Sequence, residues 1–428
     1  MKKFISLFSF VLAIILSLGT LVACGGSEPP EGESGEISIR YWYGFTGEDG
    51  TVMDSLVNSF NEEYKGQIKI STRKMGWDDL FTNLYSTSAN VKSAPHIVAM
   101  SNQRFAGAVN RKLVLKINDI VSAIGANESE YLSSAWNAGI IDGDRYSFPL
   151  DVHPTAMFYN KALISESELP KTWEEFRSVC KTKTGNGVYG CAIPNVYSIT
   201  KDLFSSYLMQ KGGELLDSDF NPAFNSSYGK TSLQYFYDLI YSDQISPSSV
   251  SSGGDQTLFG QGRSVFYFDG PWLLNTFNMI EGNGRWSNID VGVAPMPGST
   301  GDNGTSLSGS HQITLMAKTV TTDSVKNACY TFVKYLQDHA IDWAKAGQVP
   351  AKKAVYDMAQ YKEITALAPF TQEALKAGLG RSSYKYFYEC YNYAGSAVAS
   401  ALNKTMSVAN ALDNMAQQYR NFVLDDEL

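Results

Sequence analysis

Few stretches of this chain have the residue types and spacing that catalysis requires. Residues 229–231 read Gly-Lys-Thr, like the end of a phosphate-binding loop, but Phe224 stands where the first glycine of that loop belongs. Neither G-x-S-x-G nor H-E-x-x-H occurs in the sequence. A pair of glycosidase carboxylates would leave no such signature, because two acidic residues far apart in sequence can supply it. The sequence therefore favours a protein that does no covalent chemistry and leaves a polysaccharide hydrolase open.

No segment has the ligand spacing of a metal site. Asp217, Asp219 and Asn221 begin like a calcium loop, yet Pro222 replaces its glycine and Tyr228 its final glutamate. The chain has no C-x-x-C pair, and its four histidines are scattered along the sequence. We therefore expect neither a bound metal nor a cofactor.

The first 24 residues have the pattern of a secretory signal with a lipid-attachment end. Two lysines precede an apolar run, Phe4–Leu18, and the segment ends in Leu-Val-Ala-Cys, which resembles a bacterial lipobox. We expect residues 1–23 to be removed, Cys24 to carry the lipid, and residues 24–36 to form a flexible stalk. An uncleaved membrane helix would need about 20 apolar residues, more than this run supplies. The mature protein is thus expected in the bacterial cell envelope, outside the cytoplasm and lipid-anchored to a membrane.

Four cysteines remain once Cys24 is assigned to lipid. Cys180 is expected to end a helix and Cys191 to lie in the next strand, so these two could form a local disulfide. The alternative is four buried thiols, with Cys329 and Cys390 as the other two, because a free cysteine packs like a small apolar side chain. The sequence leaves both arrangements open.

The mature chain is long enough for two lobes. Removing residues 1–23 from the 428 leaves 405, and a single hydrophobic core stops growing near about 250–300 residues. The formal net charge is −8 and no basic block appears, so nucleic acid is not an expected partner. Aromatic residues make up 13% of the chain, which indicates surfaces lined by rings.

Hydrophobic patterns predict a β-α-β-α-β series at the start of the mature chain. Strands are expected at 37–43, 67–73 and 97–100, with amphipathic helices between them. Such a series forms a parallel sheet with right-handed crossovers, and its ligands bind beyond the carboxyl ends of the strands. The residues at those ends include Trp42, Tyr43, Trp77 and Asn102.

A second set of elements follows Asp151. Thr172, with Glu175 three residues later, predicts a capped helix, and residues 269–272 predict a turn into another helix. Further strands are expected at 156–159, 188–193, 264–268, 289–293 and 312–318. The chain beyond them is expected to be mostly helical, at 323–338, 340–346, 351–359, 366–377 and 396–422.

Seven short segments follow one another in an order that a known family shares. They are Ser93–Val98, Tyr146–Asp151, Met157–Lys161, Pro170–Phe176, Phe259–Ser264, Gly292–Gly298 and Gly347–Lys353. Together they resemble the extracellular solute-binding proteins of family 1, the sugar-binding lipoproteins of ABC importers. The resemblance implies an α/β protein with a two-lobe, periplasmic-binding-protein-like fold. Each lobe would be a mainly parallel sheet flanked by helices, and the ligand cleft would lie between the lobes.

The resemblance also implies how the chain divides between the lobes. Residues 37–150 are expected to form the N-terminal lobe, with a return segment at about 312–350. Residues 151–311 are expected to form the C-terminal lobe, and residues 351–428 a helical region that packs across both lobes.

A sugar site needs flat rings to stack on, with fixed donors and acceptors around the edge. The family's cleft implies such groups from both lobes, whereas His153 and His311, which flank them, are expected to be structural. The expected substrate-binding residues are Trp42, Tyr43, Trp77, Asn102, Asp151, Asp269, Trp272, Gly309, Ser310, Gln348 and Tyr386.

These expectations define a substrate-binding lipoprotein of an ABC importer, which captures a mono- or oligosaccharide and delivers it to permease subunits in the membrane. It would act as a monomer and not as an enzyme. One alternative is a binding protein for glycerol-3-phosphate or another polar solute, although few basic residues fall at the expected positions. Another is a surface polysaccharide hydrolase, and a third is an adhesin whose cleft is filled by large side chains.

Overall fold

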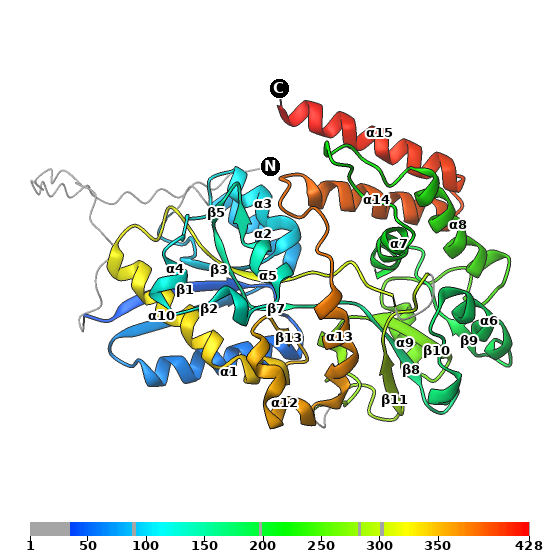
Figure 1. Ribbon diagram of the computed structural model, residues 1–428, viewed down its shortest axis with the longest axis horizontal. Coiled ribbons are helices and arrows are strands. Elements are labelled where there is room, and N and C mark those ends of the chain that lie inside the picture. Colours follow the sequence, from blue (N-terminus) through cyan, green and yellow to red (C-terminus); the bar gives the residue numbers. More distant parts are fainter. Residues whose placement is uncertain (1–34, 88–90, 197–198, 281–283, 300–303, 428) are drawn as a thin grey trace, which may run out of the picture.

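The structure, a computed structural model, describes residues 35–87, 91–196, 199–280, 284–299 and 304–427. The predicted signal peptide, the predicted lipid site at Cys24 and most of the predicted stalk lie outside these ranges. The described chain forms two lobes side by side, each built around its own sheet (Figure 1).

The first sheet has five strands in the order β2-β1-β3-β12-β6. β1 is parallel to β2 and β3, and β12 is antiparallel to both of its neighbours, so four of the five strands run the same way. This agrees with the mainly parallel sheet that the β-α-β-α-β pattern predicts. The strands are β1 (Ile37–Tyr43), β2 (Ile68–Lys74), β3 (Ile97–Ser101), β6 (Ser147–Pro149) and β12 (His311–Leu315).

Helices cover both faces of this sheet, because strand β1 is apolar on both sides. Tyr41 and Tyr43 point into one hydrophobic cluster, and Trp42, between them, points into another on the opposite face. The first cluster is covered by α1 (Glu48–Glu63), α10 (Asp323–Asp338) and α11 (Ala340–Lys345). The second is covered by α2 (Trp77–Thr87) and α3 (Asn102–Asn110).

The second sheet has four strands in the order β11-β8-β10-β9. β8 is antiparallel to β10 and β11, while β9 is parallel to β10, so one strand is again reversed. The strands are β8 (Ala156–Asn160), β9 (Tyr189–Cys191), β10 (Ser264–Asp269) and β11 (Val291–Ala294). The larger helices of this lobe are α6 (Trp173–Lys183), α7 (Ile199–Gln210), α8 (Ser227–Tyr241), α9 (Gly254–Gly260), α14 (Phe387–Leu402) and α15 (Val408–Glu427).

Two details of this lobe test the sequence patterns. The predicted capping box is confirmed, since the Thr172 hydroxyl accepts from the backbone N–H of Glu175 and the Glu175 carboxylate accepts from that of Thr172. The single helix predicted at 396–422 is wrong, because two antiparallel helices, α14 and α15, occupy the region. The chain turns after α14 through Lys404, whose φ is 58°, a left-handed conformation that ends a helix.

The chain passes between the sheets three times: from β6 to β8, from β11 to β12, and from β13 (Val349–Pro350) to α13 (Ala368–Lys376). The first and third passages pair through β7 (Asp151–Val152) and β13. The second joins the first where the backbone N–H of His153 donates to Gly309 O at 2.9 Å. The short elements are α4 (Ile120–Ala123), α5 (Ser133–Ala138), α12 (Ala359–Glu363), β4 (Ile140–Ile141), β5 (Asp144–Arg145), η1 (Glu128–Glu130), η2 (Glu166–Glu168), η3 (Pro271–Leu273), η4 (Lys353–Asp357) and η5 (Thr365–Leu367).

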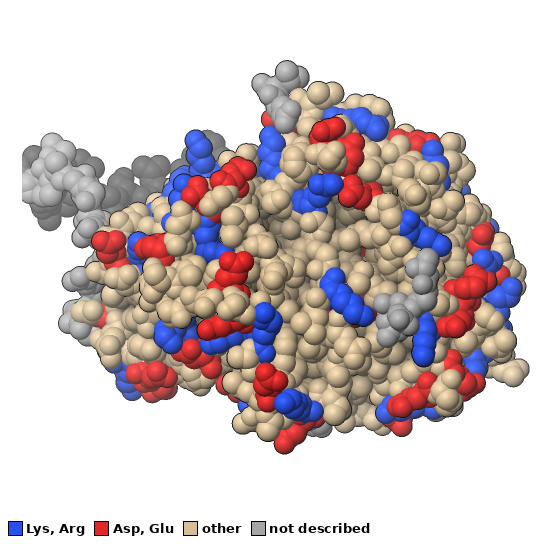
Figure 2. All heavy atoms as spheres, viewed as in Figure 1, with Lys and Arg blue, Asp and Glu red and all other residues tan. Residues whose placement is uncertain are grey.

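The surface carries charges of both signs. On the face shown in Figure 2, basic and acidic side chains alternate around the rim, and most of the centre is uncharged. Among the helices that the structure describes, none is both long enough and apolar enough to cross a membrane.

Candidate functional site

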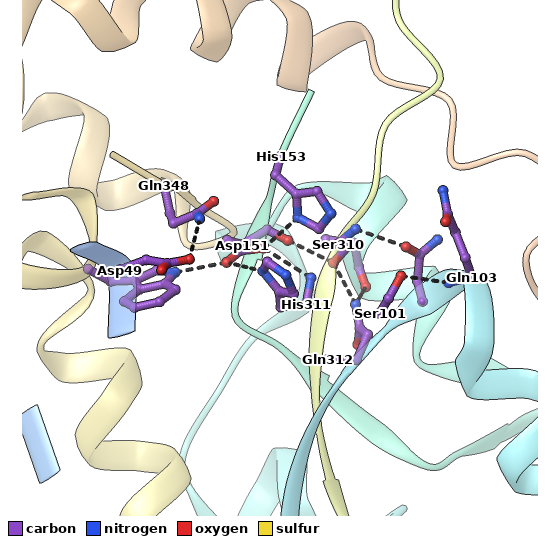
Figure 3. Close-up of polar contacts among 12 residues, drawn as sticks. Asp49, Ser101, Gln103, Asp151, His153, Ser310, His311, Gln312 and Gln348 are labelled. Carbon is purple, nitrogen blue, oxygen red and sulfur yellow. Dashed lines mark hydrogen bonds and ion pairs between the residues drawn. The ribbon is translucent and has the colours of Figure 1, made fainter. Parts of the chain in front are cut away.

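Asp151 lies where the chain first passes from one lobe to the other. Its carboxylate is fully buried and accepts four hydrogen bonds (Figure 3). The donors are the backbone N–H of His311 at 3.0 Å, the Nδ1 atoms of His311 at 2.8 Å and His153 at 3.2 Å, and the Trp343 indole N–H at 2.8 Å. Burial alone would raise the pKa of Asp151, but the positive charge of His311 and the bonds from both histidines hold that pKa well below its ordinary value. Asp151 is therefore a fixed anion at the lobe junction.

Four rings form a column that joins the lobes at this point. The Trp77 indole of α2 stacks on the His311 ring, with 5.1 Å between centroids and 7° between planes. His311 stacks in turn on His153 at 4.1 Å and 28°. Trp272, which follows β10 of the second lobe, meets His153 edge to face at 6.0 Å. Trp77 and Trp272 are both partly exposed, so the rings predicted for opposite lobes meet at the junction without being sealed in their own lobes.

Three glycines make room for this column. A Cβ atom on Gly44 would lie 2.2 Å from the Trp77 indole, and one on Gly270 would lie 2.0 Å from the Trp272 indole. A Cβ atom on Gly309 would lie 2.0 Å from Nε2 of His153. The three rings therefore rest directly on backbone, which fixes their planes more firmly than flexible side chains would.

Two predicted residues carry polar atoms that have no hydrogen-bond partner among the described residues. Gln348 is fully buried, and its amide N–H donates to Asp49 at 3.4 Å while its Oε1 atom is unpaired. The Asn102 side-chain oxygen accepts from the backbone N–H of Ser310 at 2.8 Å, while its Nδ2 atom is unpaired. An unpaired buried polar group costs about 1–3 kcal/mol. Each amide therefore has one enclosed polar atom whose hydrogen-bonding capacity is not met by the described residues.

Acidic side chains give the junction its charge. Burial raises the pKa of Asp269, in the second lobe, to about 7, against hydrogen bonds from Tyr267 and the backbone N–H of Gly270 that lower it. Burial also raises the pKa of Asp49, in the first lobe, against the charge of His311 and two backbone N–H groups. Carboxyl oxygens suit a ligand that donates hydroxyl hydrogens, and the charged Asp151 opposes an anion.

The same cluster offers the atoms of a metal site, but not its geometry. Asp151, His153 and His311 each place one ligand atom within 4.8 Å of the other two. A metal bound through nitrogen lies in the plane of the imidazole ring, and two rings stacked at 4.1 Å and 28° do not share such a point. The Asp151 carboxylate is also fully used by four donors. The cluster is therefore better suited to hydrogen bonding than to metal binding.

Three predicted ligand residues lie elsewhere. Trp42 is 2% exposed and packs in the core between the first sheet and helices α2 and α3, because β1 turns alternate side chains to opposite faces. Tyr43 is buried on the other face and donates to Asp54 of α1. Tyr386 packs in the core of the second lobe and donates to Asp426 at 2.6 Å. These three assignments are corrected, since core packing takes up each ring.

Of the two cysteine arrangements that the sequence leaves open, the described residues have the one with four buried thiols and no disulfide. Cys180 and Cys191 are both free and buried, as are Cys329 and Cys390. A Cβ atom on Gly190 would lie 2.4 Å from Cβ of Cys180, so α6 packs closely against Gly190. Both thiols lie in the hydrophobic cluster of the second lobe, where burial raises the pKa of each.

Several residues of the junction were not predicted. Phe45 meets the rings of Trp77, His311 and Trp343 edge to face, at 5.6, 4.8 and 4.9 Å. His153 and His311 were expected to be structural, yet they form the centre of the column. Their positions in the sequence, close to Asp151 and Ser310, could have indicated that both histidines belong to the site. Trp343, in the middle of a predicted helix, gave none.

Two hollows lie outside the junction. One of 640 Å³ borders β8 and β11 of the second sheet, and one of 310 Å³ lies between the end of α1 and α10. Neither is lined by any of the predicted ligand residues, so they do not compete with the junction as the site that the family resemblance implies.

The fold and the site together define a class of protein. Two α/β lobes joined by three passages, with rings and polar groups from both lobes at the junction, are the architecture of a periplasmic-type binding protein. The family model for the bacterial extracellular solute-binding protein matches residues 45–342, and the chain belongs to this family. Its members are binding proteins and not enzymes, and the family's extracellular character places this chain outside the cytoplasm.

Relatives and solved structures agree with that assignment. The chain is 23% identical over 309 residues to the galactooligosaccharide-binding protein of Bacillus subtilis (strain 168), covering 69% of this chain and 68% of the relative. It is 26% identical over 231 residues to the arabinooligosaccharide-binding protein of Halalkalibacterium halodurans, covering 51% and 49%. The maltose-bound MalE3 of T. maritima superposes with a TM-score of 0.77 at 20% identity, covering 90% of this chain and 100% of that one. The structural likeness confirms the two-lobe fold.

Proposed function

We propose that this protein is the substrate-binding lipoprotein of an ABC importer, and that it captures a mono- or oligosaccharide between its lobes. The lobes part to admit the sugar, close around it, and present it to permease subunits in the membrane. No bond of the sugar is made or broken. The ligand stabilises the closed form only through the additional contacts that it makes in that form.

The observation that carries this proposal is the ring column at the lobe junction. Trp77 comes from the first lobe and Trp272 from the second, and the two histidines between them are held by one buried carboxylate. Rings with polar groups at their edges are what the C–H faces and hydroxyl rim of a sugar require. The column contains rings from both lobes. A ligand that contacts the column therefore touches both lobes and favours their closure when it binds.

The nature of the solute is supported by charge and by the relatives. Asp151 stays charged within the column, and Asp49 lies close enough to interact with His311 and Asp151, so carboxyl groups there oppose a phosphate. The two relatives described above are named for galacto- and arabinooligosaccharides. A neutral sugar therefore fits better than glycerol-3-phosphate.

A panel of solutes tests the proposal. Thermal shift and calorimetry of the purified protein are run with maltose, glucose, galactose, arabinose and their oligosaccharides, with glycerol-3-phosphate as the anionic comparison. We expect at least one neutral sugar to bind and to raise the melting temperature, and glycerol-3-phosphate to do neither. Binding of the phosphate alone would overturn the sugar assignment.

A variant locates the sugar. Trp272→Ala removes the ring of the second lobe, and we expect it to weaken the affinity for the bound sugar about tenfold, because aromatic contacts of this kind are worth about 0.5–1.5 kcal/mol beyond the area they bury. Tyr228→Ala is the control, since Tyr228 is 50% exposed on α8, away from the junction. Equal affinities in the two variants would place the sugar elsewhere.

The same proposal includes a lipid anchor on Cys24, a signal peptide at residues 1–23 and a monomeric binding unit. The anchor is tested by expressing the full chain and Cys24→Ser in a bacterium. We expect the wild-type protein in the membrane fraction with a mass increased by lipid, and the variant outside that fraction. Membrane association of both forms would contradict the anchor.

A further inference from the structure

The Asp151 carboxylate uses only one nitrogen of each histidine. Its oxygens accept from Nδ1 of His153 at 3.2 Å and from Nδ1 of His311 at 2.8 Å. A carboxylate can only accept, so Nδ1 carries the hydrogen in both rings. Burial and the charge of His311 lower the pKa of His153 to about 4, so its ring is neutral at pH 7 and Nε2 keeps a lone pair.

Each ring turns Nδ1 to the same carboxylate, which leaves its Nε2 atom facing elsewhere. The two rings stack at 4.1 Å and 28°, so both Nε2 atoms belong to one close pair of rings. No hydrogen bond joins either Nε2 atom to a residue that the structure describes. The side chains of His153 and His311 are 14% and 8% exposed. Two nitrogens of one stacked ring pair are therefore held in place by the Asp151 contacts and have no hydrogen-bond partner among the described residues.

Resting on the proposed function, we propose that His153 and His311 form a paired recognition site for two hydroxyl groups on adjacent carbons of the bound sugar or polyol. Asp151 orients both rings and fixes their tautomers, while the two Nε2 atoms contact the ligand. A hydroxyl both donates and accepts, so neighbouring hydroxyls match neighbouring ring nitrogens. Trp77 and Trp272, at the two ends of the column, leave the pair between the stacking surfaces, where the edge of a sugar ring would lie.

The pair also explains Gly309. A side chain there would occupy the position of the His153 Nε2 atom, with its Cβ 2.0 Å away. Glycine at this position leaves Nε2 beside backbone that carries no competing donor or acceptor side chain. The recognition site thus depends on a residue that contributes only space.

Deoxy sugars and two variants test the pair. The probe is the sugar of the solute panel that binds most tightly, together with each of its monodeoxy forms. His153→Asn keeps an amide where Nδ1 contacts Asp151 but has nothing at Nε2, whereas His153→Gln places its amide near Nε2 and gives up the contact with Asp151. Calorimetry compares all three proteins, and unliganded melting confirms that each is folded.

We expect two deoxy forms, altered at adjacent carbons, to bind the wild-type protein at least tenfold more weakly than the parent sugar. In His153→Asn, one of these two deoxy forms should bind less than about twofold more weakly than the parent sugar. In His153→Gln, part of the wild-type difference in affinity should remain. Identical penalties in wild type and His153→Asn, or sensitive hydroxyls on distant carbons, would overturn the pair while leaving sugar binding intact. Failure of the wild-type protein to bind any sugar would overturn both proposals.

A measurement on the unaltered protein gives the same answer without a variant. In protein labelled with ¹⁵N-histidine, we expect the Nε2 resonances of two histidines to shift when the sugar is added, while the other two histidines do not change. Unchanged Nε2 resonances with saturating sugar would overturn the proposal.

Discussion

At the scale of single residues, the junction contains two kinds of carboxyl group. Asp151 has every acceptor position filled, and its neighbours hold its pKa below the ordinary value. Asp269 has two donors, and burial raises its pKa to about 7. The first group therefore organises the site and stays charged, whereas the second can change its charge near neutral pH.

Asp151→Asn should lower the free energy of unfolding by about 3–5 kcal/mol, because an amide group would turn N–H donors toward the donors that the carboxylate now accepts. Urea unfolding at pH 7 measures the effect. Asp338→Asn is the control, since Asp338 forms an exposed pair with Lys334 at 2.5 Å that is worth at most about 0.5 kcal/mol. Losses of similar size in the two variants would contradict the structural role of Asp151.

Asp269→Asn should change how stability depends on pH. The folded protein holds a proton up to about pH 7 that the unfolded chain releases near the ordinary pKa of 3.8. The stabilisation of wild type by this proton is complete below pH 3.8 and is lost as the pH rises through about 7. The variant has no such loss, so relative to wild type it should gain about 1–3 kcal/mol between pH 5 and pH 8.5.

Urea unfolding at the two pH values measures that gain. Asp219→Asn, exposed on the loop between α7 and α8, serves as the control and should follow wild type at both. Parallel stability profiles for Asp269→Asn and wild type would show that the Asp269 carboxyl is not held protonated by its surroundings.

At the scale of elements, local patterns predicted most strands and helices but not which face serves the site. The pattern of Ile37–Tyr43 identifies β1. It does not show whether Trp42 and Tyr43 face a ligand or a hydrophobic core, and both lie in cores. Thr172 and Glu175 marked a helix start because a cap is a local interaction. The turn at Lys404 was missed, since a lysine with φ of 58° leaves no trace in composition. Contacts such as Phe45 with Trp343 depend on packing between distant segments, which no local pattern contains.

The packing of α2 against β1 depends on Gly44, and Gly44→Ala should disturb it. A Cβ atom 2.2 Å from the Trp77 indole forces the ring off its stack on His311. We expect a loss of about 1–3 kcal/mol in unfolding free energy, as for overpacked cores, and weaker sugar binding. Gly76→Ala, in the residue directly before Trp77, is the control, since its Cβ would lie 3.7 Å from an Asp79 oxygen, an ordinary van der Waals distance. Equal stability of the two variants would show that the indole can move at no cost.

At the scale of the whole molecule, the lobes also meet away from the hinge passages. Arg104 of α3 belongs to the first lobe, and its guanidinium lies 4.7 Å from the centre of the Phe81 ring of the same lobe. On its other side it lies 3.8 Å from the centre of the Tyr388 ring, on α14 of the second lobe. It also donates to the backbone oxygen of Trp77, which begins α2. If the lobes part as proposed, Arg104 would separate from Tyr388, so this contact would favour the closed form.

Tyr388→Leu should therefore shift the protein toward its open form. A cation–π contact is worth about 0.5–2 kcal/mol, which corresponds to a change of about twofold to thirtyfold in the ratio of closed to open molecules. Small-angle X-ray scattering should show a larger radius of gyration for the unliganded variant, and the sugar affinity should fall by a similar factor because closure then costs more. Tyr388→Phe keeps the ring under Arg104 and should behave as wild type in both measurements. If Tyr388→Phe opened the protein as much as Tyr388→Leu, the hydroxyl group and not the ring would be holding the lobes together, and closure would not depend on Arg104.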